Sequence, residues 1–492
     1  MTYQPPISQI LLAMHSARTF LAPRTAELPL DDAQAIIIEA GRFAAERIAP
    51  LNRLGDLHPA ILADGKVTTP PGWGDTYREW CAGGWNSLTG PAEYGGQALS
   101  MSLAVACTEL WNSSCMAFAL CPLLTAGAIE AIAAHASADL KERYLPKLIS
   151  GEWSGTMNLT EPQAGSDLSH LRCKSRRADD GTYRITGNKI YITYGEHDCA
   201  SNIVHLVLSR LEDAPAGTRW ISLFLVPKIL PDGRNNDLRC LSLEHKLGIH
   251  GSPTCAMVYG DNEGATGWLI GEENRGLVCM FTMMNNARLL VGVQGVALAE
   301  RATQAAVAFA KERRQGRTVD KGADASAIIH HPDVKRMLLE MQAKTATARI
   351  LPIYEGTNGI QAIDLVTRKL VLESGVMLLR LLESSRLGLA RVSGEASASQ
   401  MVPAVGEMAR TISEVPGSPA SLAAATPFLR ALATTIAGGY LAETAELARG
   451  GELEREAENN ARYFITVEVP SAICAASSAV SGAAVVVNAK WS

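Results

Sequence analysis

The stretch MNLTEPQAGSDLSHLRCKSRRADDGTYRITGNKIYITYG, residues 157–195, decides the fold of this sequence. Its first half contains Glu-Pro and Ala-Gly-Ser, residue types that build turns. Its second half is rich in Tyr, Ile and Thr, which favour β-strands. We therefore predict a tight turn followed by strands. A β-turn alone would account for the first half, so a further role depends on what the rest of the chain contains.

Strand-like runs continue to about residue 270, whereas apolar residues at three- and four-residue spacing predict helices on both sides of them. One helix is expected at 31–51, ended by Pro50. The apolar run 98–136 predicts two buried helices, broken near Asn112. We predict an α+β multidomain fold with an N-terminal helical domain (1–152), a middle antiparallel β-domain (153–271), a helical bundle domain (272–387), a linker rich in Ser, Gly and Pro (388–420) and a C-terminal helical unit (421–492).

Composition excludes several classes of protein. The 492 residues carry a net charge of −5, which gives no electrostatic reason to expect nucleic-acid binding. Ten cysteines without a C-x-x-C pair argue against structural zinc, and we predict no metal site and a cytoplasmic location. Residues 471–487 are apolar but short and lack bulky side chains, so a packed helix is expected there rather than a membrane span. Neither G-x-G-x-x-G nor G-x-x-x-x-G-K-[ST] occurs, so Rossmann and P-loop sites lack support.

Three motifs stand in an order that resembles the FAD-dependent acyl-CoA dehydrogenase family. They are TEPQAGSD at 160–167, YIT at 191–193 and LPIYEGTNGIQ at 351–361. GPAEYGGQ (90–97), KLGIHGSPT (246–254) and GEENRGL (271–277) also look like this family. The opening residues and the C-terminal extension resemble a bacterial branch that includes 3-methylmercaptopropionyl-CoA dehydrogenase. The resemblance covers nearly the whole chain and implies helical, β and helical domains in that order.

Glu355 lies between an aromatic residue and a glycine, just before an apolar helical pattern. On its own, this position suits an acid at the start of a helix, with Thr357 or Asn358 as the N-cap. The resemblance implies instead that Glu355 is the catalytic base, which removes the α-proton of an acyl-CoA thioester while FAD accepts the β-hydride. It further implies that Tyr354 forms an apolar wall and that Gly356 leaves room for the acyl chain.

The resemblance also assigns the cofactor and substrate contacts. A lone Ser or Thr in a β-domain usually has a surface or turn role, and Arg288 could equally form an ordinary helical salt bridge. Asn285 stands where the family often has Asp, and Gln315-Gly316 where it usually has Phe-Gly. The expected flavin and FAD contacts are Met157, Leu159, Thr160, Ser166, Tyr191, Thr193, Arg313 and Thr357, and the expected substrate contacts are Ser166, Arg288, Tyr354 and Gly356.

One family element is absent. Relatives carry two further long helices and a Gln-x-x-Gly-Gly-x-Gly loop before the catalytic loop, whereas here Arg349 is followed almost at once by Glu355. The bundle therefore looks incomplete, and helices 276–317 and 331–349 are expected to lack part of their cover unless the C-terminal helices supply it.

Three functions stay open. The chain could be a dehydrogenase that passes electrons to an electron-transfer flavoprotein, with a homodimer or homotetramer as the expected assembly. It could be a remnant that no longer binds FAD and serves as a scaffold or acyl-CoA binder. It could also be an acyl-CoA oxidase that uses O₂.

Overall fold

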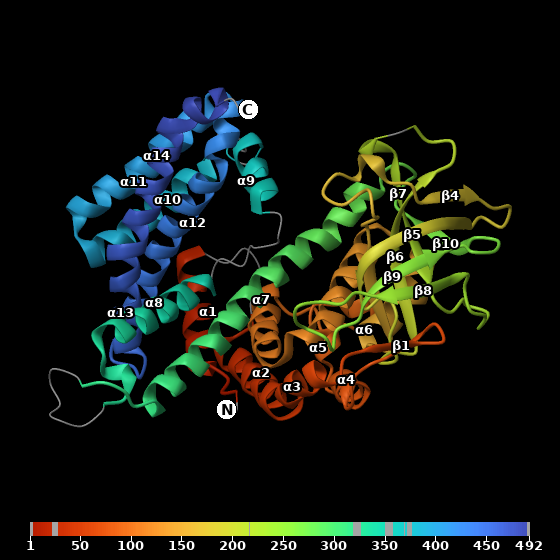
Figure 1. The fold of residues 1–492 in the computed structure, drawn as a ribbon, viewed down its shortest axis with the longest axis horizontal. Coiled ribbons are helices and arrows are strands. Elements are labelled where there is room, and N and C mark those ends of the chain that lie inside the picture. Colours follow the sequence, from red (N-terminus) through yellow and green to blue (C-terminus); the bar gives the residue numbers. More distant parts are fainter. Residues whose placement is uncertain are drawn as a thin grey trace. The chain divides into compact units, whose positions relative to one another are not determined.

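The computed structural model describes residues 3–21, 28–215, 217–317, 326–349, 358–368, 370 and 376–489. The chain divides into two compact units whose boundary lies between Leu290 and Val291. The first unit contains described residues 3–5 and 28–290. The second contains residues 6–21, which include α1 (Ile7–Leu21), and the described residues from 291 onward. Each unit has its own hydrophobic core, and Figure 1 shows the helices and strands that surround each core.

The first unit begins with helices. α2 (Leu30–Phe43) carries Asp31 and Asp32 in its first turn, where acidic side chains favour the positive helix end. The predicted end of this helix at Pro50 is wrong, because a π-helical turn at Ala44–Ile48 leads directly into α3 (Ala49–Leu57). Pro50 lies in the first turn of α3, where a missing N–H is tolerated. The next elements are β1 (Ile61–Ala63), β2 (Lys66–Thr68), α4 (Trp73–Ala82) and 3-10 turns at Trp85–Ser87 and Ala92–Tyr94.

The apolar run predicted as two helices forms α5 (Met101–His135), which is kinked. Cys115 has φ −154° and ψ 95°, outside the helical region, so the prediction of a break beside Asn112 is confirmed. Ser100 caps the start of α5 by accepting a hydrogen bond from the N–H of Leu103. α6 (Ala138–Ser150) follows, and its N-cap Ser137 accepts a hydrogen bond from the N–H of Leu140.

A β-domain follows α6. Hydrogen bonding connects its strands in the order β10-β7-β6-β4-β5-β9-β8, and a further pairing of β10 with β5 closes a ring of five strands. The expectation of a purely antiparallel domain is wrong, because β3 and β4 each pair parallel with β6. The strands are β3 (Trp153–Asn158), β4 (Lys174–Arg177), β5 (Tyr183–Thr193), β6 (Asn202–Leu211), β7 (Ile221–Pro227), β8 (Leu238–Leu243), β9 (Thr254–Tyr259) and β10 (Ala265–Ile270), with 3-10 turns at Leu168–His170 and Thr218–Trp220.

The second unit is helical. Its core takes residues from α8 and from the C-terminal helices, so the predicted division into a bundle domain and a separate C-terminal unit is replaced by one unit. The helices are α7 (Gly276–Glu312), which contributes to both units, a 3-10 turn at Ile328–His330, α8 (Pro332–Ala348), α9 (Asn358–Thr367), α10 (Val376–Ser393), α11 (Glu395–Ser413), α12 (Pro419–Leu447), α13 (Glu454–Tyr463), a π-helical turn at Phe464–Glu468 and α14 (Val469–Asn488).

The residues predicted to be a linker, 388–420, are mostly helical, because they fall in α10, in α11 and at the start of α12. α11 carries Val402, Val405 and Ile412 on its buried face, at a spacing that suits a helix. The Ser, Gly and Pro residues of 388–420 suggested a linker, but small side chains also allow helices to pack closely.

Four helices of the described part are long and apolar enough, by length and composition alone, to cross a membrane. They are α5, α7, α12 and the continuous helical segment Glu454–Asn488. In α5, 78% of the most apolar 18-residue stretch is buried inside the protein. Packing in the core therefore accounts for the apolar composition of this helix. In Glu454–Asn488 only 22% of the most apolar 18-residue stretch is buried, so the expectation of a packed helix at 471–487 stays a prediction.

Candidate active site

The C-terminal ends of β3 and β5 lie together, and they carry most of the predicted flavin contacts. Thr156 donates its hydroxyl to the carbonyl oxygen of Thr193, at 2.8 Å. The N–H of Ile190 donates to the carbonyl oxygen of Thr160, at 2.9 Å. These two bonds join the two strands on either side of Met157. The structure therefore places Met157, Leu159 and Thr160 beside Tyr191 and Thr193.

A buried ion pair fixes the turn that follows Thr160. Lys189 Nζ lies 2.9 Å from Glu161 Oε1, and the two side chains are 0% and 3% exposed. Lys189 also donates to the carbonyl oxygen of Leu159, at 2.9 Å. Glu161 accepts further hydrogen bonds from the N–H groups of Arg172, at 2.7 Å, and Cys173, at 3.0 Å. The carboxylate therefore ties the turn to both β5 and the segment before β4.

The protonation of Glu161 follows from these contacts. Burial works to raise the pKa of the carboxyl group, but the charge of Lys189 and the two backbone N–H donors outweigh burial and hold the pKa below its usual value. Glu161 therefore remains ionised, and the ion pair persists at neutral pH.

Tyr191 stands at a β-bulge of β5, where the pairing with β9 shifts register between Lys189 and Ile192. Its φ is +61°, a left-handed value that non-glycine residues seldom adopt, and its side chain is 61% exposed. Backbone strain of this kind occurs at functional sites, so the exposed ring of Tyr191 is a candidate ligand contact.

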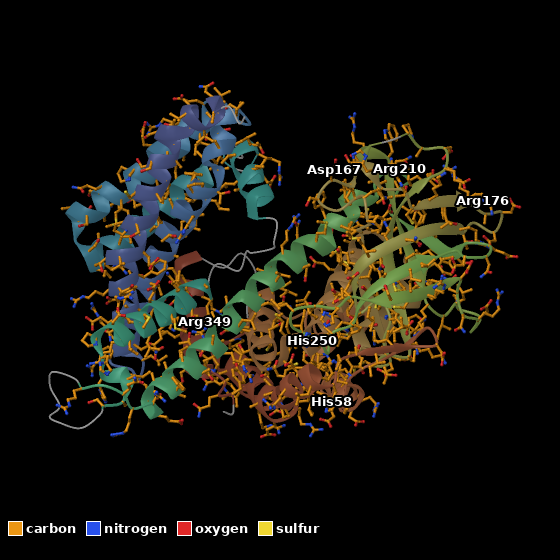
Figure 2. The ribbon with its side chains drawn as sticks, in the orientation of Figure 1. His58, Asp167, Arg176, Arg210, His250 and Arg349 are labelled. Carbon is orange, nitrogen blue, oxygen red and sulfur yellow. The ribbon has the colours of Figure 1, made fainter. Side chains whose placement is uncertain are left out.

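Ser166 lies in the exposed part of the turn, and two side chains hold the neighbouring backbone. Asp167 accepts a hydrogen bond from the N–H of Ser169, at 2.8 Å. Arg210, on β6, donates to the carbonyl oxygen of Ser169, at 3.3 Å. Figure 2 shows Asp167 and Arg210 at the same end of the β-domain. The turn that contains Ser166 is thus anchored at residue 169 while Ser166 stays accessible.

The two arginines predicted to contact the substrate and FAD, Arg288 and Arg313, have internal partners. Arg288, half-buried on α7, donates to Asn285 Oδ1 at 3.1 Å, and its guanidinium carbon lies 5.6 Å from the centre of the Phe281 ring. Arg313 is exposed and donates to Gln315 Oε1 at 2.8 Å. The residues that depart from the family pattern, Asn285 and Gln315, are therefore the hydrogen-bond partners of these arginines. Glu355, Tyr354, Gly356 and Thr357 lie outside the described residues.

Sequence reasoning missed a group of polar residues on β3 and beside it. Tyr259 donates its hydroxyl to Asn158 Oδ1 at 2.8 Å and lies 3.1 Å from His205 Nδ1. Ser154 Oγ lies 2.8 Å from His197 Nε2. These residues come from four strands or loops, so no local pattern in the sequence could have grouped them.

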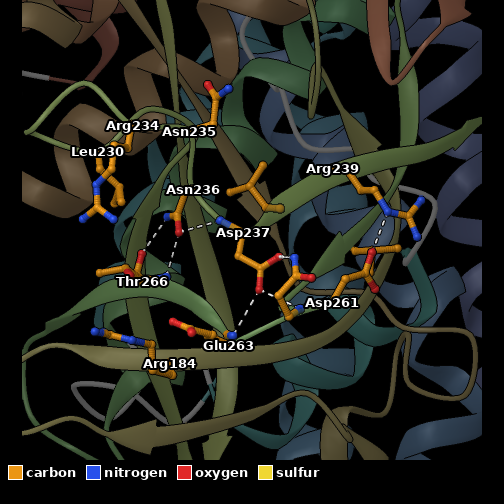
Figure 3. Close-up of a pocket in the computed structure, with 14 residues that line it drawn as sticks. Arg184, Leu230, Arg234, Asn235, Asn236, Asp237, Arg239, Asp261, Glu263 and Thr266 are labelled. Carbon is orange, nitrogen blue, oxygen red and sulfur yellow. Dashed lines mark hydrogen bonds and ion pairs between the residues drawn. The ribbon is translucent and has the colours of Figure 1, made fainter.

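A groove of about 570 Å³ opens elsewhere on the β-domain, and none of the predicted site residues lines it (Figure 3). Asp237 accepts hydrogen bonds from the N–H groups of Asn262 and Gly264, at 2.9 and 3.1 Å. Asp261 pairs with Arg239 at 2.6 Å. These acids hold the turns of the groove, so their contacts give no reason to assign a ligand to it.

Three domain models of one family match the chain. Those described as acyl-CoA dehydrogenase N-terminal, middle and C-terminal domains match residues 31–152, 156–262 and 274–351, in that order. The last match ends before Glu355.

Curated relatives agree with this assignment. The chain is 52% identical over 366 residues to 3-methylmercaptopropionyl-CoA dehydrogenase of Ruegeria pomeroyi, covering 72% of this chain and 62% of the relative. It is 35% identical over 337 residues to a butyryl-CoA dehydrogenase of Syntrophomonas wolfei, covering 65% of this chain and 55% of the relative. The chain thus spans less than two thirds of the length of these relatives.

Solved structures show the same fold. A Bacillus anthracis acyl-CoA dehydrogenase complexed with FAD has a TM-score of 0.71 at 19% identity, covering 94% of this chain and 89% of that one. Caenorhabditis elegans ACDH-11 in complex with C11-CoA has a TM-score of 0.71 at 17% identity, covering 95% and 91%. The three ordered domain matches, the relatives and the shared fold give one conclusion: the chain belongs to the acyl-CoA dehydrogenase family.

Proposed function

We propose that this chain is an FAD-dependent acyl-CoA dehydrogenase, which converts an acyl-CoA thioester into the trans-2-enoyl-CoA. One observation carries the proposal beyond family membership. The turn after β3 is locked to β5 by the buried Lys189–Glu161 pair, directly beside the bulge that exposes Tyr191. A buried ion pair is a demanding way to hold a surface turn, which suggests that the position of the turn matters for binding.

The residues present at this position fit a flavin. A planar ring system can lie against the exposed ring of Tyr191. Thr160, just after β3, and Thr193, at the end of β5, are half-buried residues that carry hydroxyl groups. Met157 and Leu159 add apolar side chains. When bound, FAD would supply the acceptor for the hydride that leaves the β-carbon, since no protein side chain can take it.

The protein's own residues would bind the thioester and remove the proton. Glu355 would take the α-proton, and its backbone N–H would donate to the thioester oxygen as negative charge develops there. Arg288 would contact the CoA phosphates, and Arg313 the pyrophosphate of FAD. Both arginines would first have to exchange or share their internal partners, Asn285 and Gln315.

The acceptor, assembly and location belong to the same proposal. We infer an electron-transfer flavoprotein as the electron acceptor, a homodimer or homotetramer as the assembly and the cytoplasm as the location. Short or thioether-bearing acyl groups are the expected substrates, in keeping with the names of the two relatives.

A second function is a binder of acyl-CoA that no longer holds FAD. The observation that favours it is the match to the family's C-terminal domain, which stops at residue 351. Both functions predict acyl-CoA binding, and only the first predicts a bound flavin.

The deciding experiment is an absorption spectrum of the purified chain, before and after anaerobic addition of short acyl-CoA thioesters. Flavin bands that bleach on addition support the dehydrogenase, and a colourless protein that takes up no added FAD contradicts it. A high peroxide yield in air, relative to dye reduction, would identify an oxidase instead.

We expect Glu355→Gln to keep the flavin spectrum and to lower the bleaching rate by about 10²- to 10⁴-fold, the usual contribution of a general base. The exposed Glu452 provides a matched control, because Glu452→Gln makes the same chemical change away from the proposed base. A Glu355→Gln variant that bleaches at the wild-type rate would remove Glu355 from this role.

A further inference from the structure

The last residue of β3, Asn158, is fully buried and lies next to the proposed flavin contacts. Side chains alternate along a strand, so Asn158 and Met157 point to opposite faces. Asn158 is also the last residue of β3 that pairs with β6, opposite Val207. It therefore stands where the chain leaves the sheet and enters the turn that carries Thr160.

Two buried side chains from other strands hold Asn158. Tyr259, on β9, donates its hydroxyl hydrogen to Asn158 Oδ1 at 2.8 Å. His205, on β6, lies with Nδ1 3.1 Å from the Tyr259 oxygen and 3.4 Å from Asn158 Nδ2. The rings of His205 and Tyr259 meet edge to face, with centres 5.8 Å apart. We call Asn158, Tyr259 and His205 the β3 anchor; each of the three is at most 1% exposed.

The β3 anchor fixes the point from which the flavin-binding turn starts. The two residues that follow Asn158 are held through their backbone carbonyl groups. Leu159 accepts from Lys189 Nζ and Thr160 from the N–H of Ile190, each at 2.9 Å. Because consecutive Cα atoms stay 3.8 Å apart, a shift of Asn158 would be passed to both of these residues.

A hydrogen bond of the same kind lies at the other end of β3. Ser154 Oγ lies 2.8 Å from His197 Nε2, and the two side chains are 1% and 2% exposed. Ser154 and Asn158 point to the same face, because they are four residues apart in a strand. That spacing corresponds to about 13 Å along the strand. One strand therefore carries two buried polar contacts, and the one at Asn158 adjoins the proposed flavin contacts.

We propose that the β3 anchor positions FAD: hydrogen bonds that end on Asn158 set where Met157 and Thr160 meet the flavin. The proposal rests on the FAD-dependent function proposed above. The three residues act through the strand and not by touching the cofactor. Burial lowers the pKa of His205 to about 3, so the imidazole stays neutral and can share a hydrogen bond without bringing a charge to the strand. A satisfied buried network of this kind favours one arrangement of the strands that carry it.

Two substitutions break the β3 anchor. Tyr259→Phe removes the hydroxyl group that holds Asn158 Oδ1. Asn158→Leu replaces the amide by an apolar group of similar shape and leaves the Tyr259 hydroxyl beside His205 Nδ1. Ser154→Ala is the matched control, because it also removes one hydroxyl group from a buried hydrogen bond on β3. Tyr259→Phe and Ser154→Ala should lower the melting temperature by similar amounts, since each loses one such bond.

Flavin binding separates positioning from stability. Fluorescence titration of the flavin-free protein with FAD, well below the melting temperature, measures the dissociation constant, and absorption records the bands of the bound flavin. We expect Tyr259→Phe and Asn158→Leu to weaken FAD binding about fivefold, the size of one hydrogen bond, and to shift the bands. Ser154→Ala should leave the dissociation constant and the bands as in the parent protein.

Hydrogen exchange checks the same inference without flavin. In Tyr259→Phe and Asn158→Leu, the backbone amides of residues 157–161 should exchange faster than in the parent protein, because a segment that loses buried contacts opens more often. In Ser154→Ala the exchange of this segment should match the parent protein.

Unchanged FAD affinity and unchanged flavin bands in a folded anchor variant overturn the proposal, whatever its melting temperature. If one variant does not fold, the other decides; if neither folds, the anchor is a requirement of the fold and the positioning role is overturned. An equal loss of affinity in Ser154→Ala would mean a general effect of stability and would also overturn it. A parent protein that binds no FAD contradicts the proposed function itself, whereas a parent protein and variants that bind FAD equally contradict the β3 anchor alone.

Discussion

Lys189 and Glu161 show how one ion pair can organise a whole segment. Lys189 bonds both the carboxylate and the carbonyl oxygen of Leu159, and Glu161 also accepts two backbone N–H groups. Neither charge is solvated, so each depends on the other. The pair therefore stabilises the turn only while both partners are present.

We expect Lys189→Met to lower the free energy of unfolding by about 3 to 5 kcal/mol, because Glu161 would be left as an uncompensated buried charge. Chemical denaturation of the purified protein measures this change. Lys174→Met is the matched control, since Lys174 is exposed on the neighbouring strand β4, and should change stability by less than about 0.5 kcal/mol. The double variant Lys189→Met/Glu161→Leu should recover part of the loss; a double variant as unstable as the sum of both single changes would contradict the pairing.

Two buried histidines beside β3, His205 on β6 and His197 in the loop after β5, predict that the stability of the protein depends on pH. Burial, with a smaller effect from the charge of Lys228, lowers the pKa of both His197 and His205 to about 3. In the unfolded chain an imidazole titrates near 6.5. Between these two values the unfolded state binds more protons than the folded state, so stability is complete above about pH 6.5 and falls as the pH drops toward 3.

We expect the free energy of unfolding to fall by about 2 kcal/mol for each of these histidines between pH 7 and pH 5. Denaturation at the two pH values measures the loss. In His205→Gln the difference between the two pH values should shrink by about half, because one titrating group is gone. An unchanged difference would show that His205 does not remain neutral in the folded protein.

Some residues of the candidate site could be predicted from the sequence and others could not. Thr160, Tyr191 and Thr193 follow from a motif, and the structure brings these three together. Lys189 was missed because a lysine in a strand ordinarily faces solvent, and only the fold shows that it points inward. His205 was missed because its partners come from other strands.

At the scale of elements, α10 and α12 cross where two glycines meet. A Cβ on Gly439 would lie 2.5 Å from Ser385 Cα, and one on Gly388 would lie 2.4 Å from the carbonyl oxygen of Gly439. Backbone atoms cannot move aside as a flexible side chain can. The helices therefore approach this closely only because neither residue has a side chain.

We expect Gly439→Ala to destabilise the second unit by about 1 to 3 kcal/mol, because the added methyl group forces the two helices apart. Gly406→Ala on α11 is the matched control, since a Cβ there meets no atom within 4 Å. The control should stabilise the helix by about 0.5 to 1 kcal/mol, the usual gain of Ala over Gly. Thermal melts of both variants measure the difference, and equal shifts of the same sign would contradict the close crossing.

Elements with strong local patterns were predicted well and those defined by distant pairing were not. β6 and β9 fall within the strand-like region predicted to continue to about residue 270. The parallel pairing of β3 with β6 could not be predicted, because it joins segments separated by three other elements. α11 was mistaken for a linker, because Ser, Gly and Pro suggest loops even where apolar residues keep a helical spacing.

At the scale of the whole molecule, the sequence predicted a helical bundle that lacks part of its cover. The second unit shows which helices cover α8. Ala343 of α8 belongs to the same core as Phe428 of α12 and Ile465 of the π-helical turn. The C-terminal helices thus cover part of α8, which was one of the two alternatives that the sequence left open. The sequence could not decide between them, because cover depends on how helices dock and not on their own periodicity.

The two separate cores lead to the last prediction. The first core lies between the N-terminal helices and the β-domain, and the second lies among α8 to α14. A chain with independent cores need not unfold in one step, so we expect calorimetry to resolve two transitions. Lys189→Met should lower the temperature of one and Gly439→Ala that of the other.

Added FAD should raise the temperature of the transition that Lys189→Met lowers, because a ligand stabilises the unit to which it binds. Gly406→Ala should leave that transition unchanged, because Gly406 lies in the second unit. A single transition that both destabilising variants shift by similar amounts would mean that the units unfold together. In that case the turn held by Lys189 and the crossing at Gly439 would depend on one cooperative structure.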